Sequence, residues 1–148
     1  MFTMKKIAIG CDHGGLDLKN AVIAHLEEKG YEVKDFGTYT KESCDYPEFA
    51  HAVGKSVASG ESDQGIVICT TGIGISIAAN KVEGIRAALC TNSLMAKMTR
   101  LHNDANVLAL GAAIVGEGLA MDIVDTFLTT DFSGEERHMR RIRKIEEV

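Results

Sequence analysis

The chain has 148 residues, of which 45% are hydrophobic and 25% are charged, and its formal net charge is -5. This composition predicts one domain, residues 1–148, with a buried core, and the acidic balance argues against general nucleic-acid binding. The start of the chain carries only a short apolar run, Ile7 to Ile9, so we expect neither a signal peptide nor a membrane span, and a cytoplasmic protein.

Strands and helices are expected to alternate along the whole chain. In the first half, the apolar pattern predicts a strand over 5–11, a helix with the stripe Leu18, Val22 and Leu26, a strand over 31–36, and a helix with the stripe Phe49, Val53 and Val57. We expect Gly30 and Gly60 to end the two helices, and Pro47 to lie in the first turn of the second helix.

The second half continues the same alternation. It predicts a strand over 66–69, a short helix from Ser76 to Asn80, a strand over 85–89, a helix up to about 102–104, a strand over 107–110, a helix over about 119–128 and a last helix over about 135–147. Such alternation indicates an α/β fold: a three-layer α/β/α sandwich, Rossmann-like, with a five-stranded parallel sheet. Ligands of such sheets bind at the carboxyl ends of the strands.

The stretch from Gly65 to Asn80 is the most informative one in the sequence. A β-branched strand ends at Cys69, and a turn of small residues and a helix start follow, so several backbone N–H groups are expected around one anion site. Cys69 would then be a thiol whose charged form these groups favour. The alternative is a buried structural cysteine beside an ordinary turn, because this glycine spacing matches neither a dinucleotide fingerprint nor a P-loop.

Three further features allow two interpretations each. His102 ends a helix, where it either satisfies the last carbonyl groups or acts as a general acid/base. Arg137 and Arg141 are spaced i, i+4, and they either bind a phosphate together or form a solvated helix face. The cysteines, which include no Cys-x-x-Cys pair, are expected to be reduced thiols, and their spacing with the histidines matches no closed zinc site.

Four stretches together resemble ribose-5-phosphate isomerase type B, a family similar to the isomerases of allose 6-phosphate and galactose 6-phosphate. They are residues 10–15 (Gly-Cys-Asp-His-Gly-Gly), 45–47 (Asp-Tyr-Pro), 69–81 (Cys-Thr-Thr-Gly-Ile-Gly-Ile-Ser-Ile-Ala-Ala-Asn-Lys) and 100–106 (Arg-Leu-His-Asn-Asp-Ala-Asn). The resemblance implies a homodimer with its site at the subunit interface, often paired into tetramers, a sugar-phosphate substrate, and neither a metal nor an organic cofactor.

The resemblance also implies a role for each matching residue in an aldose–ketose isomerisation through an enediolate. Cys69 would be the base at C2, Thr71 would bind or shuttle protons at the sugar oxygens, and His102, helped by Asp12, would open the sugar ring. The substrate-binding residues would be Asp12, His13, Tyr46, Thr70, Gly72, Ile73, Gly74, Asn103, Arg137 and Arg141. The N–H groups of the turn would hold the developing oxyanion.

This sequence departs from the family pattern at three positions. Thr70 replaces a usual glycine, Ala113 replaces an arginine that commonly reaches toward the phosphate, and Glu136 replaces a glycine before Arg137. These changes leave open an isomerase of a six-carbon sugar phosphate, such as allose 6-phosphate or galactose 6-phosphate. A module that binds phosphosugars without turnover is a further alternative, against which the joint presence of Cys69, Thr71 and His102 argues.

Overall fold

A computed structural model of the chain describes residues 4–148. Residues 1–3, on which the expectation about a signal peptide partly rests, lie outside the described residues. The elements are β1 (Lys6–Cys11), the short 3-10 helix η1 (His13–Gly15), α1 (Leu16–Glu28), β2 (Glu32–Asp35), α2 (Tyr46–Ala58), β3 (Gln64–Cys69), α3 (Ile73–Ala79), β4 (Ala87–Leu89), α4 (Ser93–Asn103), β5 (Val107–Gly111), α5 (Glu117–Thr129) and α6 (Glu136–Glu146).

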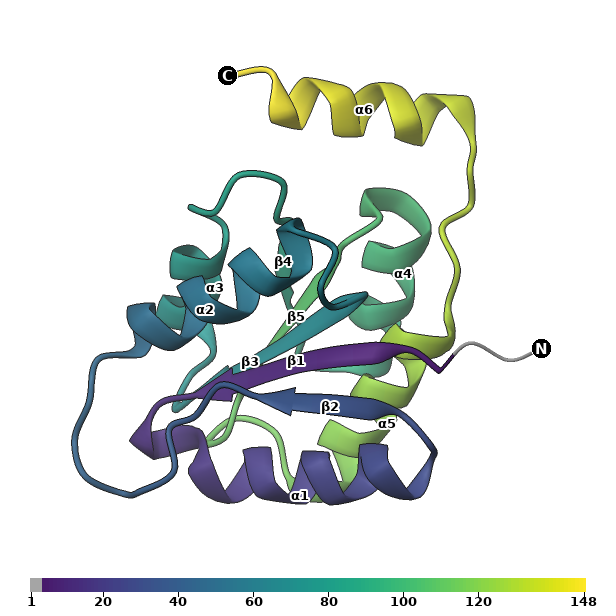
Figure 1. The fold of residues 1–148 in the computed structure, drawn as a ribbon. Helices are drawn as coiled ribbons and strands as arrows, with labels where there is room; N and C mark the ends of the chain where they lie inside the picture. Colours follow the sequence, from purple (N-terminus) through teal and green to yellow (C-terminus); the bar gives the residue numbers. More distant parts are fainter. Residues whose placement is uncertain (1–3) are drawn as a thin grey trace.

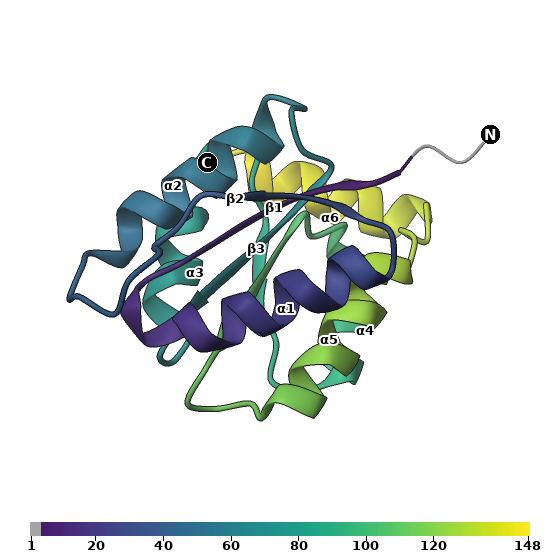
Figure 2. The ribbon, with the colours of Figure 1, turned by 60° about the horizontal axis from the view of Figure 1, so that its bottom comes forward.

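The five strands form one parallel sheet in the order β2-β1-β3-β5-β4 (Figure 1). Helices cover both faces: α1, α4 and α5 pack on one, and α2 and α3 on the other (Figures 1 and 2). This arrangement confirms the expected three-layer α/β/α fold. The chain winds from β1 to β2 in one direction and from β3 to β5 and β4 in the other, so the strand order reverses between β1 and β3, where such sheets bind ligands.

Alternate residues of β3 serve the two cores. Ile66 and Ile68 pack with α1 and α5, whereas Val67 and Cys69 pack with α2 and α3. This is the two-residue period of a strand that is buried on both faces. It places the Cys69 side chain on the side of the sheet that α2 and α3 cover.

Two predicted boundaries are wrong. Helix α3 begins at Ile73 rather than at Ser76, whose hydroxyl instead donates to the Ile73 carbonyl inside the helix at 2.7 Å. The cause is Gly72, whose φ of 78° turns the chain into the helix directly; a Cβ there would lie 2.8 Å from the Leu110 carbonyl carbon. Strand β4 begins at Ala87, because the Ile85 N–H donates to Val82 in a local turn instead of to a neighbouring strand.

The other boundaries lie within two residues of the predicted ones, as in β3, which begins at Gln64 rather than at Ile66. Gly30 and Gly60 follow the ends of α1 and α2 with φ of 90° and 83°, and Pro47 lies in the first turn of α2. Helix α6 lies outside the three layers and contacts α4 (Figure 1). Within residues 4–148, no helix combines the length and the apolar composition that a membrane crossing needs.

Candidate active site

A cavity of about 410 Å³ opens at the carboxyl ends of β1 and β3. The two strands are neighbours, with Cys11 opposite Ile68, so the residues that follow them meet at this edge. The cavity is lined by seven residues, all of which the sequence analysis singled out as site residues: Asp12, Tyr46, Cys69, Thr70, Thr71, Ile73 and Gly74. The strand order therefore joins the first and third of the four motifs in one place, and Tyr46, at the start of α2, adds the second.

Cys69 ends β3 with only 5% of its surface exposed, and the following turn wraps around its sulfur. The Gly72 N–H donates to Cys69 Sγ at 3.1 Å, and the Ile73 N–H donates to Thr71 Oγ1 at 3.2 Å. An N–H group directed at sulfur stabilises negative charge there, and the thiolate is the form of cysteine that accepts protons. The turn thus provides what a thiol base requires.

Two other cysteines are buried in surroundings that keep them protonated. Burial raises the pKa of Cys11 to about 12 and that of Cys90 to about 11. Neither residue lines the cavity at Cys69. Cys69 is therefore the cysteine that a ligand in this cavity would meet.

Asp12 and His13 are oriented by backbone groups at the end of β1. Asp12 Oδ1 accepts hydrogen bonds from the N–H groups of Gly14 at 3.0 Å and Gly15 at 3.2 Å, which leaves Oδ2 for a ligand. His13 Nδ1 accepts from the Cys44 N–H at 3.2 Å. The neutral His13 ring therefore carries its proton on Nε2, which becomes a donor on the other side of the ring.

Close contacts of two glycines shape the cavity wall. A Cβ at Gly74 would lie 2.6 Å from Tyr46 Cζ, and a Cβ at Gly14 would lie 2.2 Å from Thr70 Oγ1. The Tyr46 side chain thus packs directly on the start of α3, and the Thr70 side chain packs directly on the turn after β1. The contacts explain why small residues are needed beside Tyr46 and Thr70.

The remaining predicted site residues lie at the opposite edge of the sheet. Helix α4 runs back from β4 and ends at Asn103, four residues before β5 begins at Val107. Val107 pairs with Gly65, which precedes Cys69 on β3 by four residues, or about 13 Å of strand. One subunit therefore does not bring His102 and Asn103 to Cys69.

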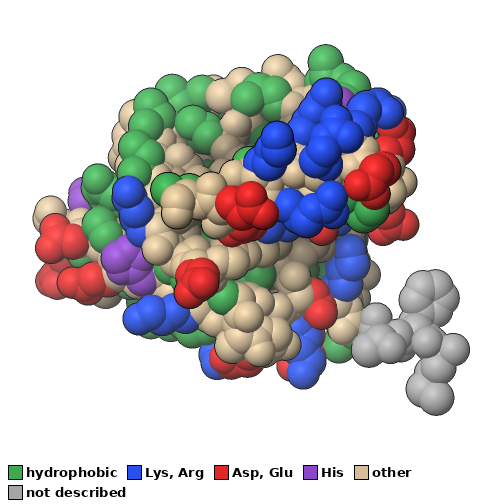
Figure 3. Space-filling model, turned by 90° about the horizontal axis from the view of Figure 1, so that it is seen from above, with side chains coloured by type: hydrophobic (Ala, Val, Ile, Leu, Met, Phe, Trp, Pro, Cys, Tyr) green, Lys and Arg blue, Asp and Glu red, His purple; other side chains and the backbone are tan. Residues whose placement is uncertain are grey.

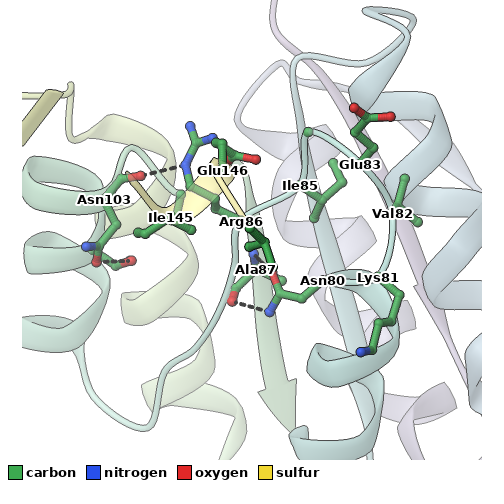
Figure 4. A pocket seen from close by; sticks show the side chains of 14 residues that line it. Asn80, Lys81, Val82, Glu83, Ile85, Arg86, Ala87, Asn103, Ile145 and Glu146 are labelled. Atoms are coloured by element: carbon green, nitrogen blue, oxygen red, sulfur yellow. Dashed lines mark hydrogen bonds and ion pairs between the residues drawn. The ribbon is translucent and has the colours of Figure 1, made fainter. Parts of the chain in front are cut away.

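Asn103 borders a different cavity, of about 540 Å³, between α4, the start of β4 and the end of α6 (Figure 4). Arg86 lines this cavity and donates to the Asn103 carbonyl at 2.8 Å and to Glu146 Oε1 at 2.8 Å. Arg137 and Arg141 are exposed on α6, which packs against α4. Asn103, His102 and the two arginines thus form a second group, distant from the first.

Sequence reasoning missed two supporting contacts of the site. One is the Cys44 N–H that fixes the His13 ring. The other is His138, which is buried and stacks on His102 with ring centroids 4.4 Å apart. A signal for His138 was present, because His138 and Ile142 are spaced i, i+4, and both lie on the less exposed side of α6.

A sequence profile of the family described as Ribose/Galactose Isomerase matches residues 7–145. The chain belongs to this family. The resemblance inferred from the four stretches is thereby confirmed.

Relatives of the ribose/galactose isomerase family match nearly the whole chain. Ribose-5-phosphate isomerase B of Escherichia coli K12 is 53% identical over 142 residues, which cover 96% of this chain and 95% of that protein. The structure of the Clostridium thermocellum ribose-5-phosphate isomerase B is 61% identical with a TM-score of 0.94, over 96% of this chain and 95% of that one. The Thermotoga maritima ribose 5-phosphate isomerase structure is 53% identical with a TM-score of 0.96, over 99% and 100% of the two chains.

Ala113, one of the three positions that depart from the expected family pattern, borders a third cavity, next to the one at Cys69. Ala113 and Thr70 line this cavity of about 410 Å³, and its charged lining residues are Asp17 and Glu117. The Ala113 N–H donates to the Thr70 carbonyl at 2.9 Å. Because the charged groups that line it are carboxylates, this cavity does not itself supply a cation for a phosphate.

Proposed function

We propose that this chain interconverts ribose 5-phosphate and ribulose 5-phosphate, with Cys69 as the base. The observation that carries the proposal is the nearly buried thiol of Cys69, which accepts a backbone N–H and lines a cavity with Asp12 and Thr71. The names of the relatives from E. coli, C. thermocellum and T. maritima support the same reaction. A thiolate beside N–H donors suits a reaction that removes a proton next to a carbonyl group.

Each proposed step uses a group at the cavity. The Cys69 thiolate takes the C2 proton of the open-chain aldose, and the electrons move onto O1, where N–H groups of the turn after Cys69 stabilise the oxyanion. The thiol then returns a proton to C1, while the O2 proton passes to O1 through Thr71 or Asp12, which gives the ketose. His102 opens the ribose ring beforehand: the C1 hydroxyl proton is transferred to the ring oxygen as the bond between C1 and that oxygen breaks, which leaves the C1 aldehyde and the C4 hydroxyl.

We propose further that a second copy of the chain supplies the second group of site residues. Large apolar side chains are exposed on α3 and α4, and the first of them also lines the cavity: Ile73, Ile77, Leu94, Met95 and Met98. Figure 3 shows hydrophobic side chains gathered beside a cluster of Lys and Arg side chains on one face. A homodimer that covers the apolar surface would bring the partner's His102, Asn103, Arg137 and Arg141 to Cys69, where the arginines would bind the phosphate.

The four cysteines are all free, which supports a reducing compartment, so we also propose a cytoplasmic location.

The direct test of function is an assay of the purified chain on ribose 5-phosphate, allose 6-phosphate and galactose 6-phosphate, measured side by side. Exchange of the C1 hydrogen of ribulose 5-phosphate with D₂O, followed by NMR, reports enediolate formation alone. Tight binding of all three sugars with neither turnover nor exchange would show a phosphosugar-binding module instead.

Gly74→Ala is expected to lower kcat/KM for ribose 5-phosphate about tenfold, or about 1.4 kcal/mol. The added Cβ would lie 2.6 Å from Tyr46 Cζ, so the tyrosine must leave the wall of the cavity. The control is a double-mutant cycle with Tyr46→Ala, in which the two losses should not add. Additive losses would mean that Gly74 acts through something other than Tyr46.

Ala113→Arg is expected to raise kcat/KM for ribose 5-phosphate about tenfold and to lower it for six-carbon sugar phosphates, because a charged hydrogen bond to phosphate contributes roughly 1.5–3 kcal/mol. The arginine would also occupy space beside Thr70 that a longer sugar needs. Ala113→Met fills the same space without charge and should show only the loss on longer sugars. An unchanged ratio of kcat/KM between the two sugar lengths would exclude position 113 as a determinant of chain length.

A further inference from the structure

His138 is a buried polar residue that the proposed chemistry does not use. It lies in the first turn of α6 and is only 6% exposed, while every other residue of that helix is at least partly exposed. Its Nε2 atom is buried and has no hydrogen-bond partner within residues 4–148. A buried imidazole nitrogen without a hydrogen-bond partner costs stability, so its presence here calls for an explanation beyond packing.

The ring of His138 meets the ring of His102. The two centroids are 4.4 Å apart and the planes are inclined by only 14°, which is a stacked arrangement. His102 itself is exposed at the end of α4, whereas the His138 ring on which it stacks is buried. The imidazole that is proposed to open the sugar ring therefore stacks on a buried ring from α6.

We propose that His138 is a positioning residue for His102: its buried ring holds the His102 imidazole in the stacked orientation in which it transfers protons to and from the sugar ring. This inference rests on the proposed function, in which His102 opens the ring. His138 is adjacent to Arg137 and three residues before Arg141. The stack therefore also ties the ring-opening group to the helix proposed to bind the phosphate.

The charges around the stack agree with a His138 that positions the ring and a His102 that transfers protons. Burial lowers the pKa of His138 below its usual range; the charges of Arg137, His102 and Arg141 act in the same direction, and Glu135 opposes them. His138 is therefore neutral near neutral pH. Two imidazolium rings at 4.4 Å would repel each other, whereas a neutral His138 ring tolerates a cation over its face.

Three variants distinguish a His138 that positions the His102 ring from a His138 that only holds α6 against the rest of the chain. His138→Ala removes the stack, His138→Phe keeps a flat ring without a buried nitrogen, and Glu146→Ala breaks the Arg86–Glu146 contact that holds the other end of α6. The readouts are the kcat for ribose 5-phosphate, the C1-hydrogen exchange of ribulose 5-phosphate in D₂O, and the His102 ring resonances in NMR spectra. Ribulose 5-phosphate has no ring to open, because its O5 carries the phosphate, so exchange does not need His102.

We expect His138→Ala to lower kcat about tenfold while exchange stays within about twofold of the parent. His138→Phe should restore kcat to within about threefold of the parent, and Glu146→Ala should leave the ratio of exchange to kcat unchanged. The ring-current displacement of the His102 resonances should disappear in His138→Ala and persist in His138→Phe.

The inference is overturned if His138→Ala leaves the ratio of exchange to kcat unchanged, or if His138→Phe loses as much kcat as His138→Ala. It is also overturned if the His102 resonances do not respond to His138→Ala, a measurement that requires no turnover. A parent protein with neither turnover nor exchange would instead overturn the proposed isomerase function itself. The two failures are thus distinguishable.

Discussion

Cys69→Ala should lower kcat for ribose 5-phosphate about 1,000-fold or more, because removing a general base typically costs two to four orders of magnitude. It should abolish the exchange of the C1 hydrogen of ribulose 5-phosphate as well, since no other lining residue of the cavity is a thiol. Binding of a phosphosugar acid, measured by calorimetry, should stay near that of the parent, because the variant removes one small side chain. Loss of both kcat and exchange with retained binding would identify the base.

The matched control for Cys69→Ala is Cys90→Ala. Cys90 is equally buried, but it packs in the core under α1, α4 and α5, and burial raises its pKa to about 11. This variant should reduce thermal stability slightly and leave kcat within about twofold of the parent. Retention of kcat within about tenfold in Cys69→Ala would contradict the assignment of the base, since about 1.4 kcal/mol is too little for one.

Complementation between two inactive subunits is the second large effect that we expect. Cys69→Ala and His102→Asn should each be nearly inactive, but a dimer that contains one of each should regain about half of the parent kcat per dimer. The reason is that one of its two sites combines the intact Cys69 of one subunit with the intact His102 of the other. The mixed dimer is obtained by co-expression with two different affinity tags and purification on both.

A mixed dimer of Cys69→Ala with a subunit that carries both Cys69→Ala and His102→Asn is the control, because it holds no intact Cys69 and should stay inactive. Sizing of the parent should show at least a dimer. An active monomer, or a mixed dimer without regained activity, would contradict the shared site. In that case His102 would have to act from a rearranged α4 of the same subunit.

Local patterns in the sequence were sufficient for the order and type of the elements. Strands such as β3 consist of β-branched runs, helices such as α1 carry apolar stripes, and Gly30 and Gly60 adopt the positive φ that ends a helix. These signals report preferences of the backbone and of neighbouring side chains, so they can be read without knowing the partners. The start of α3 could not be read in this way. A glycine is needed at position 72 because the backbone there comes close to Leu110 and Gly111, which lie on another strand.

The sequence by itself determined the α/β class, the family and the residue types of the site, because its motifs are local and specific. Only the tertiary structure decided which of these residues meet. The pairing of β1 with β3 brings Asp12 to Cys69, while the reversed course of α4 carries His102 to the far edge of the sheet, where His138 stacks on it. Such neighbours depend on strand order and helix direction, which arise from contacts between distant segments rather than from any one stretch.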